Sequence, residues 1–275
     1  MSSILTNNSA MVALQTLRGI NSNLAKIQDE ISTGKSVASA KDNAAVWAIT
    51  KTMETDVAGF KAIGDSLALG QSTVGVARAA SESVTDLLKE IKQLIVSAQE
   101  ENVDRAKIQT DITERAAQIG SIISAAQFNG LNLVDGSQTA DVSVLASLDR
   151  AADGSVTAAS IAVAPQDLDA IHTAVAAYDV EGDHEAALAD IETQLQAAIT
   201  ASANFGSVAK RIDIQSDFVK KLSDAMTSGI GALVDADMEE ASARLQALQV
   251  QQQLATQSLS IANQAPQTLL SLFRG

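Results

Sequence analysis

Residues 234–273, VDADMEEASARLQALQVQQQLATQSLSIANQAPQTLLSLF, carry mostly apolar or small side chains at alternating four- and three-residue steps. This heptad spacing predicts a helix that keeps one stripe against a partner helix. No residue in 245–273 is charged. Because an ordinary surface helix keeps a charged face in water, we expect this helix to be surrounded by other helices. The stripe comprises Val234, Met238, Ala241, Leu245, Leu248, Gln252, Ala255, Leu259, Ala262, Pro266, Leu269 and Phe273.

The same helix carries a second apolar flank and one polar residue within its main stripe. Gln252 interrupts the stripe, and we keep two interpretations: a tolerated exposed position, or a residue that fixes the register between helices. The flank indicates that more than one face of the helix needs covering. It consists of Ala243, Ala247, Val250, Leu254 and Ile261.

The start of the chain mirrors its end. No residue before Arg18 is charged, and residues 8–32 repeat the heptad steps, which predicts a helix that pairs with the C-terminal one. Gly34 interrupts this pattern, and Ser39 with Asp42 fits a capping box at the start of the next helix. The N-terminal stripe comprises Ala10, Ala13, Leu17, Ile20, Leu24, Ile27 and Ile31.

Between these ends, long helical patterns run from Val46 to Ala98, from Ile108 to Ile122 and from Leu188 to Ile230, with a polar break at 100–104. We expect Gly130 to end the second of them and residues 228–231 (SGIG) to form the joint before the terminal helix. Valine and isoleucine alternate at two residues within 131–165, which predicts β-hairpins, and a short helix follows at 167–177. The fold class is therefore mainly α: an elongated, folded-back hairpin of long coiled-coil helices with a small β-hairpin region at the outer end.

Composition excludes several classes of function. The net charge of −14 argues against nucleic-acid binding, which needs a basic surface. Residues 135–192 hold most of this charge, with twelve acidic side chains and one basic one, and we interpret them as a solvated surface. There is no cysteine, hence no disulfide or thiolate-bound metal. We expect no cleaved signal peptide and no membrane span.

The sequence offers no constellation for catalysis. The two histidines, His172 and His184, lie among acidic residues, and an exposed, structural role is favoured over metal binding because no two ligands stand at helical spacing. Trp47 and Phe60 fit packing better than a cofactor site, and the glycines form no phosphate-binding loop. We therefore expect no enzyme activity, no cofactor and no metal.

Several segments resemble bacterial flagellin. Residues 31–45 (ISTGKSVASAKDNAA) are similar to a flagellin segment of the pattern LSSGxRINSAKDDAA. The resemblance covers residues 1–135 and 200–275, and the middle resembles a much shortened form of the variable outer domains of larger flagellins. Further matching segments are 127–130 (QFNG), 233–238 (LVDADM), 253–254 (QL), 261–264 (IANQ) and 269–274 (LLSLFR).

The resemblance implies a subunit that polymerises head to tail into the flagellar filament for swimming motility. It implies three regions: an inner coiled-coil domain of 1–33 with 235–275, a long-helix bundle of 34–130 with 166–234, and a solvent-facing β-rich region at 131–165. Implied partners are further copies of the chain, an export chaperone and the type III export apparatus, hook-associated and cap proteins, and other flagellins. The residues expected to drive polymerisation are Leu17, Ile20, Leu24, Ile27, Ile31, Leu245, Leu248, Leu259, Leu269 and Phe273.

Two departures from the family pattern bear on partners. Flagellins sensed by a Toll-like innate receptor carry a segment like LQRVREL, whereas residues 88–94 here read LKEIKQL. Glu90 stands where the receptor-contacting arginine would be, so we expect weak activation or none. Ser36 replaces a frequent arginine. The segment aligned with the receptor-contacting one includes Leu88, Lys89, Glu90, Lys92 and Leu94.

Two alternatives stay open on sequence alone. A hook–filament junction protein would have similar terminal helices but would join a single ring. A coiled-coil signalling module would also give long alanine-rich hairpins, but it would have charged termini or a membrane span. The serine and threonine residues of the acidic region, such as Ser143, Thr157 and Ser160, could carry O-linked glycans.

Overall fold

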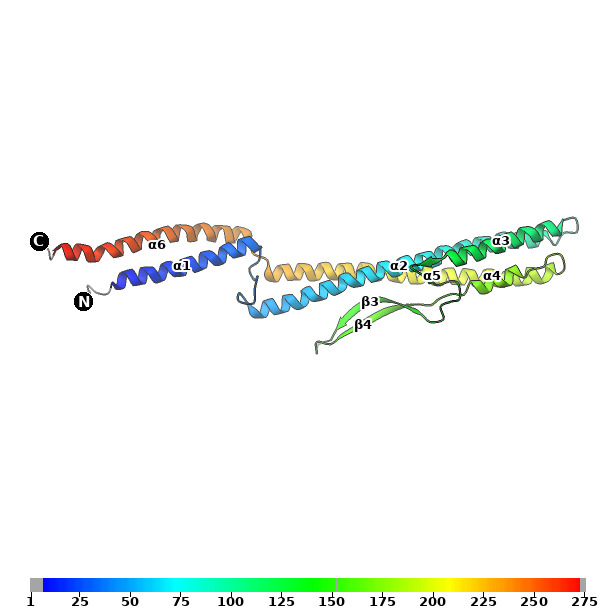
Figure 1. Ribbon diagram of the computed structural model, residues 1–275, viewed down its shortest axis with the longest axis horizontal. Helices are drawn as coiled ribbons and strands as arrows, with labels where there is room; N and C mark the ends of the chain where they lie inside the picture. The colour runs from blue at the N-terminus through cyan, green and yellow to red at the C-terminus, as the bar shows by residue number, and fades with distance from the viewer. Residues whose placement is uncertain (1–6, 152, 273–275) are drawn as a thin grey trace. The chain divides into compact units, whose positions relative to one another are not determined.

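The computed structural model describes residues 7–151 and 153–272, the side chains of 265–272 excepted (Figure 1). The chain forms two compact units. The terminal unit comprises Met1–Asp56 and Ala225–Gly275, and the long-helix unit comprises Val57–Asp224. Two helices, α2 (Ala44–Ser97) and α5 (His184–Val234), contribute to both units.

In the terminal unit, α1 (Asn8–Thr33) packs against α6 (Met238–Leu272), as Figure 1 shows. The facing positions are those of the two predicted stripes. Ile27 and Ala241 are buried, and the other described stripe positions from Ala10 to Ile31 and from Leu245 to Ala262 are half-buried. Two hydrogen bonds connect the helices across this seam, the line of contact between α1 and α6. The Gln252 amide donates to Asn21 Oδ1 at 2.8 Å, and the Asn7 amide donates to the Ala262 carbonyl at 2.7 Å.

The prediction for the first residues of the C-terminal stripe is wrong in one respect. Met238 is 44% exposed, because α6 begins there and the seam starts only at Ala241. Val234 is buried, but it closes α5 and does not belong to α6. Phe273 lies outside the described residues, as do the side chains of Pro266 and Leu269.

The joint between the helices also differs from the expectation. Helix α5 continues through the glycines at 228–231 to Val234, where the Asp235 N–H still donates to the Gly231 carbonyl at 2.8 Å. The helix ends because residues 234–236 pair with the turn after α1. Gly34, with φ of 69°, closes α1, and its carbonyl accepts from Ala236 N–H at 2.9 Å. Lys35 and Asp235 form an antiparallel bridge between the two connecting segments.

The expected capping box forms only in part. The Asp42 carboxylate accepts from the Ser39 N–H at 2.9 Å, but the Ser39 hydroxyl donates to the same carboxylate at 3.0 Å and caps no helix. The cap of α2 is Asn43, whose side chain accepts from Val46 N–H at 3.2 Å. The Ser39–Asp42 pair therefore stabilises the turn that precedes the helix.

The long-helix unit contains, besides parts of α2 and α5, the helices α3 (Arg105–Ala125) and α4 (Asp169–Ala176). Helices α3 and α4 pack against each other. The side chains on the inner faces recur at helical spacing, so one continuous apolar core runs along the unit. Its fully buried large residues include Ile63, Leu67, Leu88, Ile91, Ile95, Ile112, Ile119, Ile123, Leu133, Leu168, Ile191 and Phe205.

Two antiparallel hairpins complete this unit. Strands β1 (Gln127–Phe128) and β2 (Leu131–Asn132) are joined by Asn129 and Gly130, both at positive φ. Gly130 therefore forms a hairpin turn and does not stop α3, which ends at Ala125. Strands β3 (Val142–Arg150) and β4 (Val156–Val163) form a hairpin, as the alternation predicts, and they pair Val142 with Val163 and Val144 with Ile161.

The β3–β4 hairpin lies directly on the backbone of α2. A Cβ atom built at Gly70 would stand 2.6 and 2.7 Å from the two methyl carbons of Val144, and one at Gly59 would stand 2.9 Å from Leu148 Cδ1. From α5, the Gln215 amide donates to the Ala146 carbonyl at 2.9 Å. The two glycines thus let the hairpin approach the helix closely.

Candidate functional site

The predicted polymerisation residues occupy the seam inside the terminal unit. The structure brings together Leu17, Ile20 and Leu24 of α1 with Leu245, Leu248 and Leu259 of α6, all half-buried, while Ile27 is 7% exposed. Ile31, also half-buried, lies at the joint end of α1. These side chains therefore hold α1 and α6 of one chain together. Their part in polymerisation stays a prediction.

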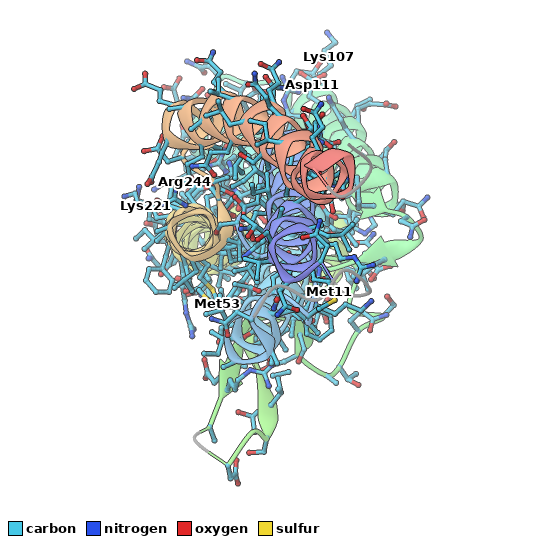
Figure 2. All side chains as sticks on the ribbon, turned by 90° about the vertical axis from the view of Figure 1, so that its left-hand side faces the viewer. Met11, Met53, Lys107, Asp111, Lys221 and Arg244 are labelled. Atoms are coloured by element: carbon cyan, nitrogen blue, oxygen red, sulfur yellow. The ribbon has the colours of Figure 1, made fainter. Side chains whose placement is uncertain are left out.

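A second set of apolar side chains is left on the outside of this helix pair. On α6 it contains the flank expected from sequence, with Val250, Leu254 and Ile261 56%, 57% and 64% exposed. On α1 it contains Met11 and Val12, 61% and 64% exposed, and Figure 2 labels Met11 on the blue helix. We call the exposed apolar positions of the two helices, Met11 and Val12 on α1 and Val250, Leu254 and Ile261 on α6, the outer apolar face.

Sequence analysis missed the α1 half of the outer apolar face. Met11 and Val12 fall between the heptad positions, so a search for one stripe passes over them. The available signal was the lack of charge before Arg18, which leaves these side chains without charged neighbours in sequence. On α6 the ion pair between Arg244 and Glu240, at 2.6 Å, lies before the uncharged stretch begins. An uncharged surface of this kind can be desolvated at little electrostatic cost.

The segment aligned with the innate-receptor contact lies on α2 in the long-helix unit. Leu88 is buried and Leu94 half-buried, so both belong to the core side of the helix. The Arg115 guanidinium donates to the Glu90 carboxylate at 3.0 Å. Glu90 therefore carries a negative charge that forms an ion pair with Arg115 on α3.

The two lysines of this segment are also engaged. Lys89 pairs with Asp86 at 2.9 Å, and Lys92 pairs with Glu192 on α5. Glu90 and Arg115 line an open hollow of about 580 Å³ that also includes Glu114 and Gln118. Exposed pairs of this kind are worth about 0–1 kcal/mol each, so they orient these side chains more than they stabilise the fold.

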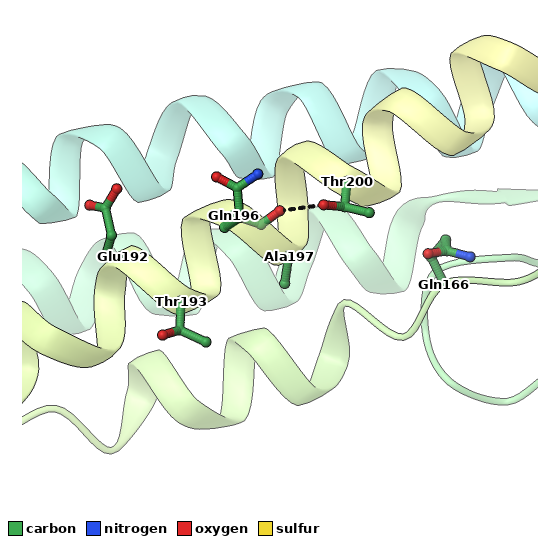
Figure 3. Close-up of a pocket in the computed structure, with 6 residues that line it drawn as sticks. All are labelled: Gln166, Glu192, Thr193, Gln196, Ala197 and Thr200. Atoms are coloured by element: carbon green, nitrogen blue, oxygen red, sulfur yellow. Dashed lines mark hydrogen bonds between the residues drawn. The ribbon is translucent and has the colours of Figure 1, made fainter.

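A hollow of about 610 Å³ along α5 shows no convergence of reactive groups (Figure 3). Its lining comes mostly from one face of α5, where the Thr200 hydroxyl donates to the Gln196 carbonyl at 2.8 Å. Glu192 is the single titratable residue in that lining, and it is paired with Lys92. An acid without a second reactive group gives no basis for catalysis.

The two histidines are both half-buried, and not exposed as expected. His172 Nδ1 lies 3.3 Å from Asp169 Oδ1, and its ring covers Gly120, where a Cβ would stand 2.8 Å from Nε2. His184 begins α5, and its carbonyl accepts from Gln99 Nε2 at 3.0 Å. Across residues 7–151 and 153–272, no three histidine, aspartate or glutamate side chains are grouped so as to hold a metal ion.

Tyr178 is another buried polar group in this unit. Burial, and then its hydrogen bond to Asp190 Oδ2 at 2.9 Å, raise the pKa of the Tyr178 hydroxyl well above its ordinary value. The hydroxyl therefore stays protonated and acts as a donor to Asp190.

Among the described helices, none combines the length and apolarity that a membrane crossing requires.

Two long helices paired along an apolar seam, with further large apolar side chains left exposed, are features of a subunit that packs against other helices. Two family models match the chain: the bacterial flagellin N-terminal helical region over residues 4–139 and the bacterial flagellin C-terminal helical region over residues 188–273. The chain belongs to the bacterial flagellin family. It is a structural protein of the flagellar filament, outside the cell, and not an enzyme.

Relatives match over the whole chain. Flagellin FljK of Caulobacter vibrioides is 40% identical over 277 residues, covering 100% of this chain and 99% of the relative. A flagellin of Brucella melitensis biotype 1 is 42% identical over 283 residues, covering all of both chains. The crystal structure of Bacillus cereus flagellin has a TM-score of 0.46 at 19% identity, covering 55% of this chain and 86% of that one. The full-length matches favour a filament subunit over a junction protein or a signalling module.

Proposed function

We propose that the outer apolar face of the terminal unit is the surface through which copies of this chain assemble into the filament. The observation that carries the proposal is the exposure of large apolar side chains on the uncharged parts of the helix pair, before Arg18 in α1 and after Arg244 in α6. Met11, Val12 and Ile261 are each more than 60% exposed, whereas the described seam positions are buried or half-buried within the chain. A soluble protein rarely leaves such a surface uncovered without a partner.

The energetics favour covering this face. Burying a large aliphatic side chain stabilises by roughly 1.5–3 kcal/mol when it is fully exposed beforehand. The five residues of the outer apolar face are a little over half exposed, so their burial contributes about half of that each. Most of the stability of a helix in a protein comes from packing of its apolar face, so the added burial offsets part of the cost of ordering this helix pair. Contacts between unlike surfaces that do not close give an open filament.

The test replaces one exposed residue of this face. Leu254→Asp puts a charge on the face without touching the seam, so the monomer should keep its helicity, while filament growth followed by sedimentation and electron microscopy should be lost. Leu254→Met, which keeps the side chain apolar, is the matched control and should assemble like the parent chain. Filaments from Leu254→Asp at the parent's critical concentration would refute the proposal.

The predicted seam residues have a related test. Deleting the last ten residues shortens α6 and removes Leu269 and Phe273, so we expect a soluble monomer that does not polymerise. Circular dichroism should show that the remaining helices persist. Normal filaments from the truncated chain, seen by electron microscopy, would count against a role for the end of α6.

Family membership supports the remaining assignments. We infer that residues 1–33 with 235–275 line the inner tube of the filament, that 34–130 with 166–234 form its outer wall, and that 131–165 face solvent. We also infer export in a largely unfolded state through the type III apparatus with a chaperone, and contacts with hook-associated proteins, the cap and other flagellins. The cysteine-free composition is compatible with that route.

We further propose that this flagellin activates the Toll-like receptor weakly. The support is the negative charge of Glu90, which stands at the position where flagellins recognised by the receptor have an arginine. Arg115 pairs with the Glu90 carboxylate at 3.0 Å. A receptor surface complementary to an arginine would meet a like charge here.

A cell-reporter assay on monomeric protein tests this proposal. Glu90→Arg should raise receptor activation at least tenfold, whereas Lys89→Arg, a neighbouring change that keeps the charge, should leave it unchanged. Parent protein as potent as an arginine-bearing flagellin would contradict the proposal.

A further inference from the structure

A second exposed apolar feature lies on α5 in the long-helix unit. Ile214 and Phe218 stand one helical turn apart and are 59% and 56% exposed. Arg211 precedes Ile214 by three residues and Lys221 follows Phe218 by three, so all four share one face. Figure 2 labels Lys221 at the outer side of its helix. We call these four residues the α5 stripe.

The cations of the α5 stripe are free to meet a partner. Within the described chain, neither Arg211 nor Lys221 forms an ion pair, although the protein carries a net charge of −14. Two unpaired cations flanking two exposed apolar side chains favour a surface that has an apolar centre and an anionic rim.

Such a surface exists in the same unit, between α2 and α5. A hollow of about 360 Å³ is lined by Glu82, Asp86 and Lys89 of α2 and by Ile199 and Ser202 of α5, with Thr85 completing it. Ile199 is 39% exposed and gives the hollow an apolar wall. The two carboxylates are exposed and paired only along their own helix, Glu82 with Arg78 at 3.6 Å and Asp86 with Lys89 at 2.9 Å. Pairs of this kind are weak and exchange readily.

The hollow also contains a polar atom without a partner. The Ser202 hydroxyl oxygen is buried and makes no hydrogen bond within the described residues. Other hydroxyls on these helices donate to the carbonyl four residues back, as Ser81 does at 2.8 Å and Thr200 at 2.8 Å. An unsatisfied hydroxyl next to an apolar wall is costly unless a donor or acceptor reaches it.

We propose that the α5 stripe of one copy docks into this hollow on a second copy. Phe218 and Ile214 would cover Ile199, while Arg211 and Lys221 would approach Glu82 and Asp86. The two surfaces cannot meet within one chain, because about 16 residues of continuous helix, on the order of 24 Å, separate Ser202 from Phe218. The contact joins unlike surfaces, so it propagates along an open assembly. This inference rests on the proposed function and adds a subunit contact outside the terminal helices.

Charge reversal on each side tests the pairing in the full chain. The first variant carries Arg211→Glu with Lys221→Glu, the second carries Glu82→Lys with Asp86→Lys, and the third combines all four changes. Sedimentation gives the critical concentration for filament growth. Each reversed pair should raise it about tenfold or more, and the combined variant should return to within about threefold of the parent. Lys61→Glu with Lys107→Glu alters the net charge as the first variant does, at two other exposed lysines of this unit, and should match the parent.

The outcomes separate this inference from the proposed function. Because the changed side chains are solvent-exposed, thermal unfolding of every monomer should stay near that of the parent. If the first variant assembles like the lysine control, the α5 stripe is not an interface and the inference is overturned. If both reversed pairs weaken assembly but the combination gives no recovery, the two surfaces meet other partners and the pairing is overturned. If the parent chain itself forms no filament, the proposed function fails and this inference falls with it.

The cysteine-free chain allows a direct second measurement. Phe218→Cys combined with Ile199→Cys should give disulfide-linked ladders when filaments are oxidised with diamide, seen on non-reducing gels. Either single variant should give no ladder. Absence of a ladder in oxidised filaments of the double variant would also overturn the pairing.

Discussion

The contact between Gly70 and Val144 predicts that one methyl group can loosen the β3–β4 hairpin from α2. In Gly70→Ala the added Cβ would stand 2.6 Å and 2.7 Å from the two Val144 methyl carbons, well inside van der Waals contact. Val144 is 7% exposed and paired with Ile161, so it has little room to retreat. The hairpin or the helix must shift.

The magnitude follows from two opposing effects. Replacing a glycine inside a helix by alanine stabilises by about 0.5–1 kcal/mol through helix propensity. Overpacking at a buried contact costs about 1–3 kcal/mol. Gly70→Ala should therefore be neutral to destabilising by about 2 kcal/mol. At Gly64 and Gly75, in the same helix, an added Cβ meets no atom within 4 Å, so alanine there should stabilise by the propensity gain alone.

Thermal and chemical unfolding of the monomer measure this difference. Gly64→Ala and Gly75→Ala are the matched controls, and Gly70→Ala should be less stable than either by about 1–3 kcal/mol, or several degrees in Tm. Combining Gly70→Ala with Val144→Ala removes the clash, so the double variant should lose less than the sum of the two single losses. If Gly70→Ala stabilises as much as Gly64→Ala, the close approach of the hairpin to α2 is refuted.

Three further predictions concern turns and the joint. Gly130→Ala forces alanine to a φ of 80° in the β1–β2 turn and should destabilise the protein by about 1–2 kcal/mol in urea unfolding, whereas Gln127→Ala, at an exposed strand position, should change little. The Ser39 N–H, and then its hydroxyl, hold the pKa of Asp42 below its ordinary 3.8, so this carboxylate stabilises the fold above pH 3.8 and does so less as the pH falls through the lowered pKa. Asp42→Asn should therefore lose more stability at pH 6 than at pH 2.5 in denaturant titrations, and equal losses at the two pH values would contradict the assignment. The Ser36 N–H and hydroxyl both donate to the Val234 carbonyl, at 2.7 and 3.1 Å, and Ser36→Ala removes the second of these bonds. The loss should cost about 0.5–1.5 kcal/mol of local stability and appear as faster amide exchange at Ala236, whereas unchanged exchange at Ala236 would argue against a stabilising role for the hydroxyl.

The sequence predicted those parts of the fold that depend on local periodicity. The heptad steps at both ends correctly indicated which faces of α1 and α6 meet, because helical spacing alone brings those residues to one side. The alternation of Val142 with Val144 and of Ile161 with Val163 likewise indicated the β3–β4 pairing. Gln252, the polar residue in the stripe, indeed bonds across the seam to Asn21.

The features that were missed depend on contacts between segments distant in sequence. Glycine is tolerated inside a helix, so the glycines at 229 and 231 did not mark the joint; α5 ends only where Val234 pairs with Ser36. Gly130 has the same positive φ in a hairpin turn as in a helix cap, and sequence alone does not separate the two. The pairing of Glu90 with Arg115 requires the register between α2 and α3, which periodicity does not supply.

Electron cryomicroscopy of filaments grown from the purified chain would show which surfaces the subunits bury. We expect filaments in which α1 and α6 stay paired within each subunit while Val250, Leu254 and Ile261 are buried against neighbouring copies. Filaments that leave the outer apolar face in solvent, or a chain that stays monomeric at high concentration under polymerising conditions, would contradict this expectation.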